Sequence, residues 1–150
     1  MNSVTLKKID ESNFIDCFHL KLAPGQEKFV SDPVRSLAQA YVYYPQCTPF
    51  GVYDGDRMVG YLMIIYDYDE ETYNIWHLMI DAAEQGKGYG AAALRSALDS
   101  IAQKPFGASD RVLLTCNPDN RIAYQLYLRF GFAPTGRVDD DEVELEYRLK

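Results

Sequence analysis

A glycine-rich run between a predicted strand and a predicted helix is the feature that most constrains the fold of this chain. The run spans residues 85–90 and follows an apolar, partly alternating segment at 75–80, which predicts a strand. Residues 91–98 are rich in strong helix formers and carry apolar side chains at helical spacing. Glycines allow close approach to the backbone, whose N–H groups then point into one concavity at the positive end of the helix dipole. The arrangement therefore predicts a binding site for a pyrophosphate.

The spacing within this run separates it from two common phosphate-binding motifs. Lys87 is followed by glycine rather than by Ser or Thr, which excludes a P-loop, and the glycine spacing does not match G-x-G-x-x-G. A turn without a ligand is the alternative. The run does match Q/R-x-x-G-x-G/A, and in this it resembles the GCN5-related N-acetyltransferases (GNAT), whose loop of this form holds the pyrophosphate of acetyl-CoA. The resemblance implies cofactor binding by Gln85, Gly86, Lys87, Gly88, Tyr89 and Gly90.

A second motif further along the chain resembles the same family. Residues 111–116 form a short apolar run that predicts a buried strand, and residues 117–120 supply capping side chains and an early proline that open a helix. From Asn120 the chain reads N-x-x-A-x-x-L-Y-x-x-F-G-F, which is similar to the second GNAT signature. The resemblance covers the chain from about Val59 onward. It implies that the CoA groove is lined by Asn117, Asn120, Ala123 and Tyr124, with helix capping as the alternative for Asn120.

The resemblance also implies a general acid. Tyr127 matches the family tyrosine that protonates the departing thiolate, and a phenol with a reference pKa of about 10 is protonated at neutral pH. Half-buried packing is the alternative, because the chain has 12 tyrosines. Met79 and Ile80 match positions whose backbone contacts the pantetheine arm, while their side chains are expected in the core.

The general base has several candidates. Many GNAT relatives carry a glutamate on the strand before the glycine loop, whereas residues 73–80 contain no carboxylate. His77 is the side chain in this segment that titrates near neutrality, which makes it a candidate base, with a packing role as the alternative. Glu71 or Asp81 could instead act through water, or the reaction could proceed without a dedicated base.

Composition limits the kinds of partner. A chain of 150 residues predicts a single domain, here residues 1–150. Its net charge of −7 argues against nucleic acid and favours a cationic substrate. Three cysteines without metal-type spacing predict a reduced, cytoplasmic protein without a metal site, and no segment is long enough to span a membrane. Acidic clusters at 67–71 and 139–142 lie between strand-like segments, so both predict hairpin turns; in the family, the second position lies beside the acceptor site.

The element order predicts an α+β fold, with a mixed, mostly antiparallel sheet and helices on both faces, as in the acyl-CoA N-acyltransferase (GNAT) fold. Predicted strands span residues 4–9, 50–53, 58–66, 75–80, 111–116, 133–138 and 143–149. Predicted helices span residues 11–22, 26–41 with an irregularity near Pro33, 91–98 and 122–130.

The expected reaction is transfer of the acetyl group of acetyl-CoA to a primary amine by direct attack in a ternary complex. Segments at 26–30 and 36–41 are similar to bacterial spermine/spermidine acetyltransferases, which favours a polyamine acceptor. Carboxylates and the rings of Tyr41, Tyr43 or Tyr44 would suit its ammonium groups. The alternatives are another amine (a protein N-terminus, a lysine or an aminoglycoside) and a weakly catalytic acetyl-CoA sensor. Dimers are common among relatives, although no feature of this sequence demands one.

Overall fold

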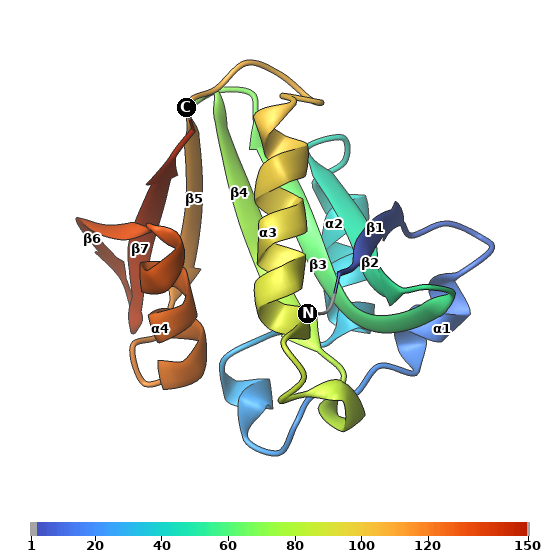
Figure 1. Cartoon of the computed structure of the whole chain (residues 1–150). Helices are drawn as coiled ribbons and strands as arrows, with labels where there is room; N and C mark the ends of the chain where they lie inside the picture. Colours follow the sequence, from blue (N-terminus) through green and yellow to red (C-terminus); the bar gives the residue numbers. More distant parts are fainter. Residues whose placement is uncertain (1–2, 150) are drawn as a thin grey trace.

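Residues 3–149, which this computed structural model describes, form a seven-stranded sheet in the order β1-β2-β3-β4-β5-β7-β6, with helices on both faces (Figure 1). The strands are β1 (Thr5–Lys8), β2 (Cys47–Asp54), β3 (Arg57–Asp67), β4 (Thr72–Ile80), β5 (Arg111–Cys116), β6 (Ala133–Asp139) and β7 (Glu142–Arg148). The α-helices are α1 (Phe14–Phe18), α2 (Pro33–Val42), α3 (Tyr89–Ala102) and α4 (Arg121–Phe130), with short 3-10 helices η1 (Gln26–Lys28) and η2 (Ala82–Glu84). The predicted fold class is confirmed.

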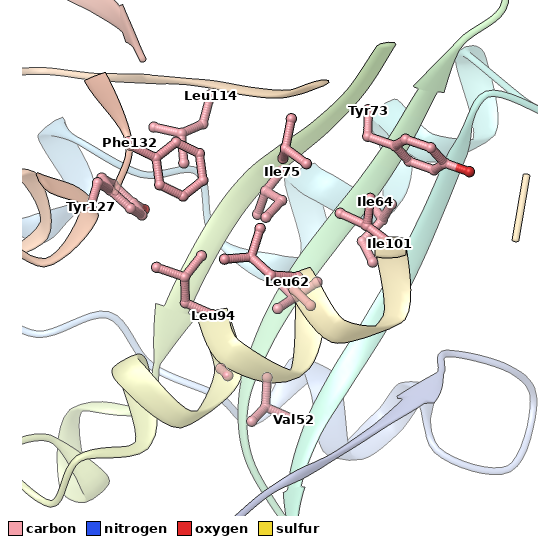
Figure 2. Close-up of a cluster of buried hydrophobic side chains, with 14 of the residues drawn as sticks. Val52, Leu62, Ile64, Tyr73, Ile75, Leu94, Ile101, Leu114, Tyr127 and Phe132 are labelled. Carbon is pink, nitrogen blue, oxygen red and sulfur yellow. The ribbon is translucent and has the colours of Figure 1, made fainter. Parts of the chain in front are cut away.

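The interior strand β3 contributes to two core layers because its side chains alternate between the faces of the sheet. Leu62 and Ile64 belong to the same buried cluster as the inward-facing side chains of α3 and Tyr127 of α4, and Figure 2 shows this cluster. Tyr61, Met63 and Ile65 pack on the opposite face with side chains of the α1 and α2 region. Each face of the sheet is therefore covered by its own helices.

The sheet opens between β4 and β5. These strands are parallel, and their register pairs are Tyr73 with Val112 and Asn74 with Leu113, whereas the other neighbouring strands of the described chain are antiparallel. Figure 1 shows β4 and β5 close together at one end and well apart at the other, with α4 beside the β5, β7 and β6 half. The sheet therefore contains a splayed gap between two well-paired halves.

The predicted helix at 11–22 is wrong in length, because α1 contains five residues. Beyond it, the Lys21 backbone N–H donates to Asp81 Oδ1 and its carbonyl accepts from the Ala82 N–H, both at 2.8 Å. These bonds tie the segment to the end of β4, which a continuing helix could not do. Phe18, the last residue of α1, has 43% of its surface exposed.

The irregular helical region predicted at 26–41 consists of η1 and α2. Asp32 is the N-cap of α2, where its Oδ1 accepts a hydrogen bond from the Arg35 N–H at 2.9 Å, and Pro33 occupies the first turn. This start places the buried side of α2 against the second core layer.

We predict that Tyr73→Phe destabilises the fold. The Tyr73 hydroxyl accepts hydrogen bonds from the Phe106 and Gly107 N–H groups at 3.0 Å and donates to the Gly107 carbonyl at 2.7 Å. Removing it leaves these part-buried backbone groups without their partner, which should lower the free energy of unfolding by about 1–3 kcal/mol in urea titrations. The matched control is Tyr68→Phe at a half-exposed position, and equal effects of the two substitutions would contradict this account.

Candidate active site

The N-terminus of α3 has the backbone geometry that anion binding requires. Gly86 and Gly88 have φ angles of 79° and 88°, in the left-handed region that favours glycine. Gly88 is the N-cap and has no side chain to cap the helix, so the first N–H groups of α3 are left for a ligand. A Cβ added at Gly86 would meet nothing within 4 Å, so the space over this residue is open. The loop fits the pyrophosphate that the sequence predicts.

Two side chains of the loop bind the protein itself. Gln85 Nε2 donates to the Ile80 carbonyl and to Gln26 Oε1, both at 3.0 Å, and so ties the loop to β4 and η1. The Tyr89 hydroxyl donates to the Asp54 carboxylate on β2, and the Tyr89 side chain is buried. Gln85 and Tyr89 would therefore contact a pyrophosphate through their backbone atoms.

Lys87 carries the positive charge of the loop and shares it with an acidic neighbour. Its Nζ lies 2.9 Å from Glu84 Oε1, and Arg57 also pairs with Glu84. A phosphate would therefore compete with Glu84 for the Lys87 ammonium group.

The backbone of β4 offers a second surface for an extended ligand. The Met79 and Ile80 side chains are buried, as expected, and these residues pair with Tyr61 and Gly60 on β3. Register pairing with β5 ends at Asn74, so the other edge of β4 beyond this residue faces the gap between the two halves of the sheet. Backbone donors and acceptors along this edge have no register pair on β5.

β4 also carries a bulge at the gap. Tyr61 pairs with Met79 and Met63 pairs with Trp76, so β4 has one more residue than β3 between these pairs. His77 lies within this stretch with a φ angle of 60°, which is uncommon for a residue other than glycine. The bulge places His77 on the wall of a cavity.

This cavity has a volume of about 420 Å³ and lies where β4 and β5 diverge. Its walls come from β4, β5, α2, the start of α4, the loop before α2 and the β6–β7 hairpin. It brings together five of the predicted site residues, namely His77, Asn117, Asn120, Ala123 and Tyr127. The cavity lining does not include Met79 and Ile80, at the end of β4, or the glycine loop that follows them. Tyr124 is also not part of the lining and packs against the hydrophobic core.

Tyr127 faces this cavity from α4. Its ring meets Phe132 edge-on with the ring centres 5.8 Å apart, and Figure 2 shows both rings beside Leu114. Burial, with a smaller contribution from Cys116, raises the pKa of Tyr127 above its usual value, so the phenol is protonated at neutral pH. The Tyr127 hydroxyl makes no hydrogen bond with residues 3–149. It is also not a fully buried atom without a partner, since Gln39 Oε1 is the one such side-chain atom in this part of the chain. The Tyr127 hydroxyl is therefore open to the cavity.

The two asparagines before α4 have different surroundings. Asn117 Oδ1 accepts from the Asp119 N–H at 2.9 Å, and its Nδ2 donates to Asp141 Oδ2 at 3.1 Å, which ties the loop to the β6–β7 turn. Asn120 is the N-cap of α4 but makes no side-chain capping bond. Its side chain therefore lines the cavity without the capping role that was the alternative.

Both acidic clusters lie in hairpin turns, as predicted, and the second one borders the cavity. Asp139 and Glu142 pair at the end of the β6–β7 hairpin, and both line the cavity. Across from them, α2 contributes Gln39, whose Oε1 is buried without a hydrogen-bond partner. These oxygens would accept hydrogen bonds from a ligand that carries N–H groups.

His77 is held by a chain of buried hydroxyl groups. Its Nδ1 lies 2.7 Å from Ser36 Oγ on α2, and Ser36 Oγ lies 2.7 Å from the Tyr61 hydroxyl on β3. Burial lowers the pKa of His77 to about 4, so the imidazole is neutral at physiological pH. Neither Ser36 nor Tyr61 carried a sequence signal for this role, because their contact with His77 depends on how α2 packs on the sheet.

Cys116 is a potential nucleophile on the cavity wall. Burial, with a smaller effect of Glu142, raises the pKa of its thiol to about 11. The thiol is therefore protonated at neutral pH and is a poor nucleophile.

Several other candidates lie away from the cavity. Glu71, considered as a base, is exposed in the β3–β4 turn, and Asp81 Oδ1 accepts the Lys21 N–H. The aromatic rings on the cavity are those of Phe29 and Trp76, besides Tyr127 itself. The expected rings at the C-terminal end of α2, those of Tyr41, Tyr43 and Tyr44, are exposed and are not part of its lining.

Comparison with known proteins decides the family. Residues 14–132 match the Acetyltransferase (GNAT) family. The chain belongs to this family. The predicted family and the predicted enzyme class, an acetyltransferase, are thereby confirmed.

Individual relatives of this GNAT chain differ in what they act on. It is 28% identical, over 145 residues, to a spermine/spermidine N(1)-acetyltransferase of Bacillus subtilis, covering 91% of this chain and 92% of that protein. A spermidine N-acetyltransferase from Vibrio cholerae, solved with CoA and spermine, has a TM-score of 0.77 at 17% identity, covering 98% and 96% of the two chains. A Salmonella typhimurium enzyme that modifies the N-terminal serine of ribosomal protein L7/L12 has a TM-score of 0.71 at 15% identity, covering 100% and 97%. The fold alone thus does not decide the acceptor.

Two features are absent from residues 3–149 of this GNAT chain. No group of three or more His, Cys, Asp or Glu side chains is arranged there to hold a metal ion. No helix in this part of the chain is both long and apolar enough to cross a membrane.

We predict that His77 makes the folded state less stable in acid. Its folded pKa of about 4 lies below the usual value of 6.5, so between these values the unfolded chain binds a proton that the folded chain does not. The free energy of unfolding should therefore fall as the pH falls from about 6.5 to about 4, and His77→Gln should flatten this dependence. Urea titrations across the window test this, with exposed His19→Gln as the matched control. Parallel pH profiles for wild type and His77→Gln would contradict it.

Proposed function

We propose that this chain transfers the acetyl group of acetyl-CoA to a primary amine, and that this amine belongs to a polyamine such as spermine or spermidine. The observation that carries the proposal is the cavity between β4 and β5, which joins Tyr127 and His77 to the carboxylates of Asp139 and Glu142. A donor phenol and a binding site for positive charge thus border one space, which opens beside the edge of β4.

Acetyl-CoA fits the groove that starts at the α3 N-terminus. The pyrophosphate would take the N–H groups after Gly86 and Gly88, and the pantetheine arm would pair with the open edge of β4 near Met79 and Ile80. Asn117, Asn120 and Ala123 line the opposite side of the gap, at the start of α4. The thioester would then lie in the cavity, near Tyr127.

The reaction proceeds by direct attack. The neutral amine nitrogen attacks the thioester carbon, forming the C–N bond and moving the carbonyl π electrons onto oxygen. When this tetrahedral intermediate collapses, the C–S bond breaks and its electron pair leaves on sulfur, which takes the proton of the Tyr127 hydroxyl. The proton lost by the amine passes to solvent and the phenolate takes one back, so the protons balance. The protonated thiol of Cys116 supports this route over an acetyl-cysteine intermediate.

A polyamine suits the mixed polar and aromatic lining of the cavity. Its ammonium groups can pair with Asp139 and Glu142 and donate to Gln39 Oε1, and its methylene segments can pack against Phe29 and Trp76. The net charge of −7 would also attract a polycation over a longer range. The relative from Bacillus subtilis, a spermine/spermidine acetyltransferase, supports the same acceptor.

Two expectations from the sequence stay predictions. They are that residues 1–150 form a single domain and that the chain is cytoplasmic. A homodimer, common among relatives, is the candidate assembly. The apolar side chains exposed at the end of α2, such as Tyr41, are the place to substitute when association is measured by light scattering.

We predict that Tyr127→Phe lowers kcat at least about tenfold and leaves the affinity for acetyl-CoA unchanged, because phenylalanine keeps the packing against Phe132 but has no proton to donate. Stopped-flow or steady-state CoA release gives kcat, and calorimetry gives the affinity. Tyr68→Phe, at a half-exposed position that is not part of the cavity lining, is the matched control. An unchanged kcat across a pH series would remove Tyr127 from the mechanism, and tight acetyl-CoA binding without turnover of any amine would favour a sensor.

We predict that Glu142→Gln raises the KM for spermidine about five- to tenfold with little change in kcat, because it removes a charge that pairs with the substrate but not with the reacting atoms. The matched control is Glu70→Gln in the β3–β4 turn, which changes the net charge equally but lies away from the cavity.

The assay follows CoA release with a thiol-reactive dye, for spermine, spermidine, lysine, an aminoglycoside and short peptides. Polyamine turnover that weakens with salt supports the proposal, whereas turnover of peptides or aminoglycosides alone would replace the acceptor.

A further inference from the structure

The hydroxyl chain behind His77 determines which nitrogen of its ring carries the proton. Tyr61 is fully buried, and its hydroxyl has Ser36 Oγ as its partner in the described structure. A buried O–H that does not donate is costly, so the Tyr61 hydroxyl donates to Ser36. Ser36 is also fully buried, and its single proton then has His77 Nδ1 as its acceptor.

This order of donors leaves Nδ1 of His77 without a proton. A neutral imidazole carries one proton, so the proton must be on Nε2. The reverse order, with Nδ1–H donating to Ser36 and Ser36 to Tyr61, would leave the Tyr61 proton buried without an acceptor. The hydrogen-bond chain therefore selects one tautomer.

The Nε2 atom of His77 is accessible to a ligand. It makes no hydrogen bond with residues 3–149, yet it is not among the buried atoms without a partner in that part of the chain, so a ligand can reach it. His77 lines the cavity, and the bulge holds its backbone in place.

We propose that His77 acts as a hydrogen-bond donor through Nε2–H to the carbonyl oxygen of the acetyl thioester, and that Ser36 and Tyr61 are positioning residues that hold this tautomer. The proposal rests on the proposed function and assigns a role within it. The thioester oxygen gains negative charge as the amine attacks, so a donor aimed at it stabilises the transition state more than the ground state. In this tautomer Nε2 has no lone pair for a proton, so His77 is not the base that removes the amine proton.

The tautomer can be measured without turnover. The described chain has two histidines, His19 and His77, so ¹⁵N-histidine labelling and long-range ¹H–¹⁵N correlation resolve both rings in the free protein. We expect the Nε2–H pattern for His77 in the wild type, and a mixed pattern in Tyr61→Phe, where Ser36 no longer has to accept a proton from Tyr61. Ser36→Ala should also give a mixed pattern. A predominantly Nδ1–H ring in the wild type would overturn the proposal, whatever the enzyme turns over.

The catalytic role is tested by two amide substitutions. The Gln amide nitrogen can occupy the place of Nε2 and donate but cannot act as a base, whereas the Asn amide reaches only the place of Nδ1. We expect His77→Gln to keep kcat within about tenfold of wild type and His77→Asn and His77→Ala to lose about 100-fold, the usual cost of one oxyanion donor. Asn tolerates a positive φ better than Gln, so this order cannot come from backbone strain at residue 77.

The outcomes separate this proposal from the proposed function. Equal losses in His77→Gln and His77→Asn, with Tyr127→Phe still impaired, would overturn the donor role and leave the acetyltransferase proposal standing. A wild type that turns over no amine would remove the proposed function, and with it the thioester as the acceptor of the His77 hydrogen bond. A kcat of His77→Gln close to wild type, together with the Nε2–H pattern, would support the donor.

Discussion

The parting of β4 from β5 is the constraint on which the site depends. Two adjacent parallel strands would normally pair along their length, but here the register pairs end at Asn74 and Leu113. The backbone groups beyond them cannot stay buried without partners, so the edge of β4 must face solvent or a ligand. The antiparallel pairs on either side hold the two halves of the sheet, and Tyr73 anchors the end where β4 and β5 still pair. A gap lined by a strand edge without a strand partner is the result.

The bulge in β4 gives this gap its chemistry. A regular strand would keep the β3–β4 alternation through residue 77, whereas one extra residue changes the register and leaves His77 between the cavity and α2. There the imidazole meets Ser36, which α2 buries against Tyr61 of β3. A helix from the first third of the chain thereby controls a ring on the central sheet.

The sequence predicted the parts of the site that are local in the chain. The glycine loop and the helix from Asn120 to Gly131 combine backbone requirements with side-chain patterns over a few residues, and both lie as expected. The cavity wall from Phe29 and Gln39, and the contact of Ser36 with His77, depend on the packing of distant segments. Helix α1 was overestimated because its apolar spacing cannot show that Lys21 bonds to the end of β4.

The cavity also suggests how the reaction can proceed without a carboxylate base. Three titratable groups on its wall are held neutral by burial, since the pKa values of Tyr127 and Cys116 are raised and that of His77 is lowered. The carboxylates of Asp139 and Glu142 line the cavity from the β6–β7 hairpin. An amine that is buried beside the neutral groups meets the same desolvation, which lowers its pKa and favours the neutral nucleophile. A distal ammonium group of the proposed polyamine can keep its charge beside Asp139 and Glu142. One site can therefore hold one nitrogen of the substrate charged and another nitrogen neutral.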